Sequence, residues 1–593
     1  MPRIGPCRGC RTARHDTSIF SNEALMKRLA LLALVAAVVL GIDRTSAMVP
    51  EQIKIDTGTI EGVTGTVKPT VRIFKGIRFA APPVGENRWR APQPAAKWDG
   101  VFKANAFGPS CVAAGGAGGR GRGGAPGRGG APGAGARGGD APAAAAPQAA
   151  APPPAPRQPP ASEDCLTLNV WTSASRDNDR RPVMLWIYGG GFTGGSGGQE
   201  WYDGEDLAAK GPVIVTFNYR LGSFGFFAHP ELAKEAGHPG SGNYGMMDAI
   251  AALQWIQRNI RNFGGDPNNV TIAGESAGAI MVGALVGSPQ GKKLFHHAIA
   301  ESGAWMGLQM ARMRSGEQAQ ADGAKALETA GIKSIAELRA KPFAELPQIP
   351  NNGGLVIDGY MIPEDLSITF ANGKQNDVDV LAGSNKDENT LFGGGGRGGR
   401  GGAGGAAAAP GSAVDAYVAR AKTQYGELAD TFLKLYPATT DAEVAAMQAQ
   451  AQNDEINWNM RQFAAAQSKK GRKGYAYFFT RVPLRNGQPQ ANGASHTAEI
   501  SYVFNHAYSN GPLEWNDVDR KLADTMSSYW VNFITKGDPN GAGLPAWPPY
   551  KDLSKDRVIV LGDTVQTEAA PPAEKLAFFN ARYARLMKTN TTN

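Results

Sequence analysis

One short segment, residues 270–286, constrains the fold more than any other part of this sequence. Strand-forming residues from Val270 to Ala273 lead into Gly274-Glu-Ser276-Ala-Gly278, and a small, apolar, helix-compatible stretch follows. The turn from strand to helix is so tight that glycines are needed where a Cβ would clash with neighbouring backbone. It lifts the Ser276 hydroxyl clear of the sheet, which predicts a nucleophile. The alternative is an ordinary glycine-bounded turn, because Gly, Ser and Ala are common residues.

Short apolar runs alternate with helical patterns around this segment, as in proteins built on a parallel sheet. The further predicted strands are residues 183–188, 213–219, 297–300 and 378–382. Apolar residues at steps of three and four predict a helix at 250–263 and another at 522–533. The glycines and proline of 264–267 predict a helix end followed by a turn, and Gly537 marks the end of the second helix.

Two low-complexity stretches cannot contribute to a core. Residues 114–162 consist mainly of Gly, Ala, Pro and Arg without an aromatic residue, and residues 393–411 are almost wholly Gly, Ala and Arg. Both are predicted to be disordered insertions. Without them and the first 47 residues, 478 residues remain, which suits a single large domain within 48–593.

The net charge of +8 does not indicate a nucleic-acid partner. The excess of basic residues lies in the first 47 residues and in the two insertions, so the rest of the chain is close to neutral. The Arg-Gly steps at 119–122 and 396–400 resemble segments that follow nucleic-acid backbones. They are short, and a solvated linker is the better interpretation.

The N-terminus predicts export to a secreted or periplasmic location. Lys27-Arg28 precede an apolar run from 29 to 40, and small residues at 45–47 offer a cleavage site. Met26 stands directly before the basic pair, so we expect it to be the true start of a leader that ends at residue 47. The apolar run is too short to span a bilayer comfortably, and no other long apolar run exists. No stable membrane insertion is expected.

The cysteines predict a disulfide rather than a metal or redox site. Cys7 and Cys10 form a C-x-x-C pair, but no second pair accompanies them. Cys111 and Cys165 remain after the leader, and an even count in an exported protein favours a bond between them. We expect no metal and no cofactor.

A glycine-rich loop follows the predicted strand at 183–188. Three glycines, Gly189, Gly190 and Gly191, follow Tyr188 directly, and their bare backbone N–H groups can approach a substrate. This is the position and type of the oxyanion loop in the α/β-hydrolase fold, the fold class that we predict here. The alternative is a flexible turn that continues into the glycines of 194–198.

Chain order selects the partners of the nucleophile, because the triad of this fold runs Ser, acid, His. Only His496 and His506 follow a plausible acid, and His496 lies in a loop, whereas His506 follows an apolar run and is expected to be structural or on the surface. Glu388 lies just past a predicted strand and is our choice for the acid. Asp387 is its neighbour and rival, and Glu499 could hold the histidine loop instead of orienting the imidazole.

Four segments together resemble the type-B carboxylesterase family, which includes the cholinesterases. Residues 263–278 read FGGDPNNVTIAGESAG and match its nucleophile signature; the others are EDCLTLNV at 163–170, FKGIRFAAPPVG at 74–85 and GASHTAEISYVF at 493–504. The resemblance extends from about residue 51 to the C-terminal helix. Three positions depart from the family pattern: Ser173, Ala249 and Asn389.

The resemblance implies a carboxylic ester hydrolase that acts on small-molecule esters. It implies Ser276, Glu388 and His496 as the triad. The other implied residues are the N–H donors of Gly190, Gly191 and Ala277, a Cys111–Cys165 disulfide, and Ser302 as a supporting partner of the triad. A non-catalytic binding or adhesion protein on the same fold is the alternative, but such members typically lose a triad residue.

Selectivity for choline esters is not expected. In cholinesterases a tryptophan in the loop closed by this disulfide stacks on the choline cation. Residues 112–164, the corresponding loop here, contain no aromatic residue. The sequence does not determine the acyl group, the alcohol or the oligomeric state.

Overall fold

The structure is a computed structural model that describes residues 48–113, 160–303, 313–347, 349, 354–388, 412–485, 487–509, 511–569 and 571–590. The contacts within Met48–Asn593 form one compact unit. The predicted leader at 1–47, the predicted insertion at 393–411 and most of the insertion at 114–162 lie outside the described residues.

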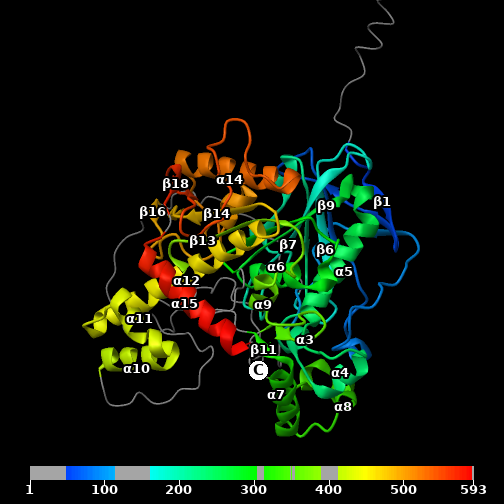
Figure 1. Cartoon of the computed structure of the whole chain (residues 1–593). Coiled ribbons are helices and arrows are strands. Elements are labelled where there is room, and N and C mark those ends of the chain that lie inside the picture. Colours follow the sequence, from blue (N-terminus) through cyan, green and yellow to red (C-terminus); the bar gives the residue numbers. More distant parts are fainter. Residues whose placement is uncertain are drawn as a thin grey trace, which may run out of the picture. The chain divides into compact units, whose positions relative to one another are not determined.

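An eleven-stranded sheet forms the centre of this unit (Figure 1). Its strand order is β18-β17-β14-β13-β10-β9-β7-β8-β6-β4-β3. The six pairs from β8 through β17 are parallel, and antiparallel pairs flank them on both sides. The strands are β3 (Val63–Thr64), β4 (Arg72–Arg78), β6 (Thr167–Thr172), β7 (Arg181–Ile187), β8 (Val213–Phe217), β9 (Gly265–Glu275), β10 (His297–Glu301), β13 (Asp379–Asn385), β14 (Gly474–Phe479), β17 (Val558–Leu561) and β18 (Val565–Glu568).

Three smaller sheets accompany the central one among the described residues. They join β1 (Gln52–Ile55), β2 (Gly58–Glu61) and β5 (Val101–Lys103); β11 (Arg314–Ser315) and β12 (Val356–Ile357); and β15 (Leu484–Arg485) and β16 (Gln488–Pro489).

Helices cover both faces of the central sheet. The α-helices are α2 (Glu205–Ala209), α3 (Gly222–Phe226), α4 (Pro230–Ala236), α5 (Tyr244–Asn259), α6 (Ala277–Gly287), α7 (Gly316–Thr329), α8 (Ile335–Ala340), α9 (Leu366–Ala371), α10 (Ala413–Tyr425), α11 (Ala429–Leu435), α12 (Asp441–Ser468), α13 (Ile500–Phe504), α14 (Asp517–Lys536) and α15 (Ala573–Asn590). Helix α14 packs on β7 and β9, whereas α12 packs on β13 and β14, and in Figure 1 the strands lie between these helices. The prediction of a large, mostly parallel sheet flanked by helices is confirmed.

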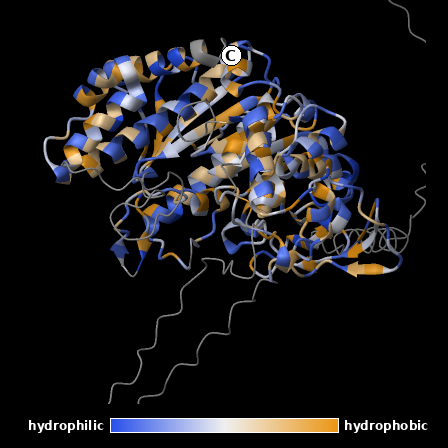
Figure 2. Ribbon diagram, turned by 90° about the horizontal axis from the view of Figure 1, so that it is seen from below, coloured by the Kyte–Doolittle hydropathy of each residue, from blue (hydrophilic) through white to orange (hydrophobic). Residues whose placement is uncertain are grey.

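Burial on both faces explains why the central strands are apolar without alternation. Every residue of β8 is buried, and so are the last five residues of β7. A strand with helices on both faces exposes neither set of its side chains, so both sets must be apolar. Figure 2 shows the flanking helices changing between hydrophilic and hydrophobic colour along their length, as expected for helices with one buried face.

The predicted helix at 250–263 is confirmed, but the turn predicted at 264–267 is wrong. Helix α5 passes into a short 3-10 helix, Ile260–Phe263, and ends at Gly264 with φ of 77°. Strand β9 then begins at once with Gly265, which pairs with Arg181 of β7. The register of this pairing shifts between Arg181 and Val183. Pro267 lies at this irregular point, where it does not have to donate the backbone hydrogen bond that a regular inner strand requires.

Helix α14 confirms the second predicted helix and extends it in both directions. Asn516 and Asp519 form a reciprocal capping box at its start, and Gly537 ends it in the left-handed conformation with φ of 65°. Among the described residues, no helix combines the length and the apolar character that crossing a bilayer requires.

Candidate active site

Ser276 occupies the strained turn between β9 and α6. Its backbone has φ of 54° and ψ of −124°, a conformation that non-glycine residues rarely adopt. The glycines on either side are required by close backbone contact, because a Cβ on Gly278 would overlap the carbonyl oxygen of Ile187 and one on Gly274 would lie 2.6 Å from it. The turn leaves Ser276 partly exposed between buried neighbours.

The glycine-rich loop after β7 lies directly against this turn. A Cβ on Gly189 would lie 2.9 Å from the Cβ of Ser276. Gly190 and Gly191 follow with φ of 115° and 62°, and both are exposed. Ala277, the first residue of α6, belongs to the helix N-terminus, where backbone N–H groups have no partner within the helix. The three predicted oxyanion donors therefore come from two segments that meet at Ser276.

His496 and Glu388 are in contact. The imidazole Nδ1 lies 2.6 Å from Oε2 of Glu388, and both side chains are buried. The other carboxylate oxygen, Oε1, accepts a hydrogen bond from the backbone N–H of Asn385 at 2.7 Å. Asn385 ends β13, so the carboxylate is held at the end of a central strand.

Glu275 also contacts the imidazole, and sequence reasoning did not single it out. Its Oε1 lies 3.0 Å from Nε2 of His496. The side chain is buried and belongs to the last residue of β9. The sequence signal that could have identified Glu275 is its position directly before the predicted nucleophile. A residue adjacent to Ser276 in the chain can reach the same histidine.

Two further buried carboxyl groups, Glu499 and Glu301, interact electrostatically with Glu275. Glu499 accepts hydrogen bonds from Ser302 Oγ at 3.3 Å and from Asn385 Nδ2 at 2.5 Å. Glu301 accepts a hydrogen bond from the indole N–H of Trp530 at 2.8 Å. Ser302 therefore donates a hydrogen bond to Glu499, which also accepts one from Asn385. Glu388, by contrast, contacts the imidazole.

Burial and mutual repulsion shift the titration of this cluster. Burial raises the pKa of Glu275, and burial together with the charge of Glu499 raises the pKa of Glu301 well above its usual range. Burial and the neighbouring carboxylates raise the pKa of Glu499 to about 8. Burial acts to lower the pKa of His496, but the charges of Glu275 and Glu388 outweigh it and raise that pKa well above 6.5.

The rival residues from the sequence have other contacts. His506 Nδ1 lies 3.9 Å from Oδ2 of Asp206, and the interaction with that carboxylate raises the pKa of His506. Asp387 accepts a hydrogen bond from the backbone N–H of Ala494 at 2.8 Å.

Cys111 and Cys165 form a disulfide with an S–S distance of 2.00 Å, and both are buried. The bond spans 54 residues of sequence, including the insertion predicted at 114–162. Among the described residues, no group of His, Cys, Asp and Glu side chains has the arrangement of a metal site.

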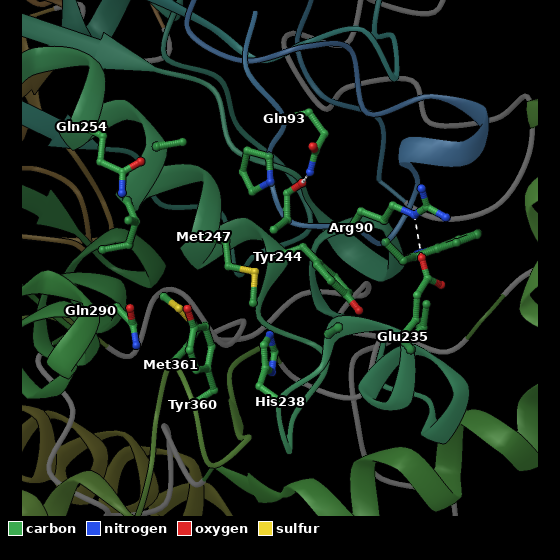
Figure 3. A pocket seen from close by; sticks show the side chains of 17 residues that line it. Arg90, Gln93, Glu235, His238, Tyr244, Met247, Gln254, Gln290, Tyr360 and Met361 are labelled. Atoms are coloured by element: carbon green, nitrogen blue, oxygen red, sulfur yellow. Dashed lines mark hydrogen bonds and ion pairs between the residues drawn. The ribbon is translucent and has the colours of Figure 1, made fainter. Parts of the chain in front are cut away.

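A pocket of about 670 Å³ opens elsewhere, along α5 (Figure 3). Its wall combines aromatic and sulfur-containing side chains, such as Tyr244, Met247 and Tyr360, with the ion pair between Arg90 and Glu235. None of the predicted triad residues lines it. This pocket is therefore separate from the predicted triad.

Comparisons with known proteins show which family the chain resembles. A family model described as "Carboxylesterase family" matches residues 49–579. The fumonisin B1 esterase of Sphingopyxis macrogoltabida is 36% identical over 509 residues, which cover 84% of each chain. The para-nitrobenzyl esterase of Bacillus subtilis is 31% identical over 539 residues, 86% of this chain and 96% of that protein.

Solved structures show the same architecture. A structure of PNB esterase superposes with a TM-score of 0.68 at 29% identity and covers 89% of this chain and 99% of that one. The carboxylesterase EST55 of Geobacillus stearothermophilus superposes with a TM-score of 0.67 at 28% identity and the same coverage. The predicted α/β-hydrolase fold is confirmed, and the protein is a carboxylic ester hydrolase. The chain belongs to the carboxylesterase family.

Proposed function

We propose that this enzyme hydrolyses carboxylic esters through Ser276, His496 and Glu388, by way of an acyl-enzyme intermediate. The observation that carries the proposal is the 2.6 Å contact between His496 Nδ1 and the buried Glu388 carboxylate. The other imidazole nitrogen, Nε2, lies 3.0 Å from the side chain of Glu275, and Glu275 directly precedes Ser276 in the chain. A base oriented by a carboxylate beside a strained serine is the arrangement that nucleophilic catalysis requires.

In the proposed reaction, the Ser276 oxygen attacks the carbonyl carbon of the ester while Nε2 of His496 takes the hydroxyl proton. The tetrahedral intermediate collapses as the bond to the alcohol oxygen breaks, and the imidazolium gives its proton to that oxygen. Water then attacks the acyl-enzyme with His496 again acting as the base. The acid leaves, and Ser276 regains its proton.

Three backbone N–H groups support the negative charge on the carbonyl oxygen. They belong to Gly190 and Gly191, which follow the Gly189 that lies against the turn, and to Ala277, which follows Ser276 at the start of α6. Each donor of this kind contributes about 3 kcal/mol to transition-state stabilisation in comparable enzymes. The exposure of the two glycines leaves their N–H groups accessible to a substrate.

Substitution of the nucleophile tests this mechanism. Ser276→Ala should abolish turnover of short p-nitrophenyl esters and labelling by a fluorophosphonate probe, while the thermal unfolding midpoint stays close to that of the parent protein. Ser528→Ala, on α14, is the matched control and should retain both activity and labelling. Turnover that persists in Ser276→Ala would refute the assignment.

The substrates we propose are small organic esters without a requirement for a cationic alcohol. The names of two relatives point to fumonisin B1 and para-nitrobenzyl esters, so both belong in the first substrate panel. The loop closed by the disulfide has no aromatic residue to stack on choline, so choline esters should show no advantage over neutral esters of equal acyl length.

We further propose that the enzyme is exported after removal of a leader that ends at residue 47 and starts at Met26, and that 48–593 functions as one domain. The disulfide between Cys111 and Cys165 supports this location, because such bonds persist in oxidising compartments. N-terminal sequencing of protein from the periplasm or the medium tests the cleavage site. A mature protein that retains residues 27–47 would contradict it.

A further inference from the structure

The segment that carries Glu388 and the segment that carries His496 are joined by more than the contact between those two side chains. Asp387 and Ser495 form an isolated parallel β-bridge, although about a hundred residues of chain separate them. The backbone N–H of Asp387 donates to the carbonyl of Ala494 at 3.0 Å. The backbone N–H of Ala494 donates in return to Oδ2 of Asp387 at 2.8 Å.

A second side chain reinforces this junction. Asn385 Nδ2 donates to the carbonyl of Ser495 at 2.8 Å and also to Glu499. Ala494 is fully buried, so its N–H has no water to replace a lost acceptor. The histidine loop is therefore held to the acid segment at the residues directly before His496.

We propose that Asp387 is a positioning residue that sets the location of His496 relative to Glu388, an inference that rests on the proposed function of those two residues. Its carboxylate accepts a hydrogen bond from the backbone N–H of Ala494, two residues before the imidazole. Gly493 fits this role, because it has φ of 68° and a Cβ there would overlap the Asp387 carboxylate. Asp387 thus holds the histidine loop, and Glu388 orients the imidazole ring.

Loss of the Asp387 carboxylate should loosen the histidine loop and leave the contacts with the substrate unchanged. In Asp387→Ala we expect kcat to fall about 10- to 100-fold with little change in KM, since a displacement of about 1 Å in a catalytic group can cost a factor of about 100. The acid limb of the pH–rate profile should also move to lower pH, because an imidazole less well paired with Glu388 has a lower pKa. A purely structural role would lower the amount of folded enzyme but leave kcat per active site and the pH profile unchanged.

The experiment compares Asp387→Ala, Asp387→Asn and Lys386→Ala, with active sites counted by fluorophosphonate titration. Asp387→Asn should recover most of kcat, because an amide oxygen can still accept the Ala494 N–H. Lys386 is exposed and should be replaceable without effect. If Asp387→Ala does not fold, Gly493→Ala perturbs the same contact from the other side and should give the same fall in kcat.

An unchanged kcat and pH profile in folded Asp387→Ala, or in folded Gly493→Ala where Asp387→Ala fails to fold, overturns the proposal. So does a failure of Asp387→Asn to recover activity above the alanine variant. Either result leaves the serine mechanism standing if Ser276→Ala is inactive, whereas activity in Ser276→Ala removes the proposed function itself.

Discussion

The Nε2 atom of His496 lies 3.0 Å from Oε1 of Glu275, the residue directly before Ser276. Glu388 contacts the other nitrogen, so the imidazole lies between two buried carboxyl groups. A charged histidine is stabilised in that position, yet only the neutral form can take the proton of a serine hydroxyl. The surroundings of the base therefore bear directly on the pH at which the enzyme works.

Glu275→Gln should extend activity to lower pH. The Glu275 carboxylate raises the pKa of His496, so an amide in its place lowers that pKa and keeps the imidazole neutral in more acidic solution. The acid midpoint of kcat/KM, measured with a p-nitrophenyl ester, should lie above 6.5 in the parent enzyme and fall in the variant. Glu317→Gln, at an exposed position on α7, is the control. An unmoved or higher midpoint in Glu275→Gln would show that this carboxylate does not govern the base.

Glu499→Gln should make stability less dependent on pH between 4.5 and 8. The folded protein holds the pKa of Glu499 at about 8, above its ordinary value of 4.5, so the folded state keeps a proton there that the unfolded chain releases. By linkage, this contribution is fully present below pH 4.5 and is lost as pH rises through 8. Urea unfolding at several pH values measures the slope. Equal slopes in the parent and the variant would contradict the shifted pKa.

Gly278→Ala should destabilise the protein by about 3 kcal/mol, a figure at the upper end of ordinary overpacking costs. The added Cβ would overlap the Ile187 carbonyl, and both groups belong to rigid backbone. Gly194→Ala adds the same methyl group where the nearest atom lies 4.0 Å away, and it should cost far less. Denaturant midpoints compare the two variants, and a similar loss in both would rule out the steric explanation.

Removal of the disulfide should cost about 4 kcal/mol by the chain-entropy estimate for a loop of this length. The bond joins positions 54 residues apart, so its loss frees a long loop in the unfolded chain. Calorimetry of the Cys111→Ala/Cys165→Ala protein, with and without reductant, tests this. Reductant should lower the unfolding temperature of the parent protein only. A parent protein that is indifferent to reductant would count against a stabilising bond.

Asp248→Ala should cost about 3–5 kcal/mol, because it leaves a buried guanidinium without its counter-charge. Asp248 and Arg220 are both buried, and their closest contact, from Nη2 to Oδ1, is 2.7 Å. Replacing Arg220 by Met in the same protein should restore part of the lost stability. Urea unfolding of the single and double variants measures the difference. A double variant less stable than Asp248→Ala would argue that the cost comes from lost packing.

Local patterns predicted the elements that carry the nucleophile because those patterns reflect nearby contacts. Ser276 lies between β9 and α6 as expected, and the helices at 250–263 and 522–533 are present. The error at 264–267 has a tertiary cause. Pairing of Gly265 with β7 makes a strand out of residues that a local reading assigns to a turn.

The contacts of the buried carboxyl groups could not be predicted from local sequence patterns. Nothing local relates Glu301 to Trp530, which are 229 residues apart, or Asn385 to Glu499, which are 114 apart. Glu275 lay inside the recognised motif, but only the packed structure places it against His496. Ser302 was expected to support the triad, and its contact with Glu499 emerges only from the fold.

The sequence by itself determined the kinds of reactive group, their order along the chain and the strands and helices that carry them, because these depend on neighbours within a few turns of backbone. Only the tertiary structure decided which carboxyl groups contact the imidazole of His496, which residue holds the histidine loop, and in which direction each pKa shifts. Those properties depend on distances between distant segments and on the exclusion of water from the space between them, and neither exists until the chain has folded.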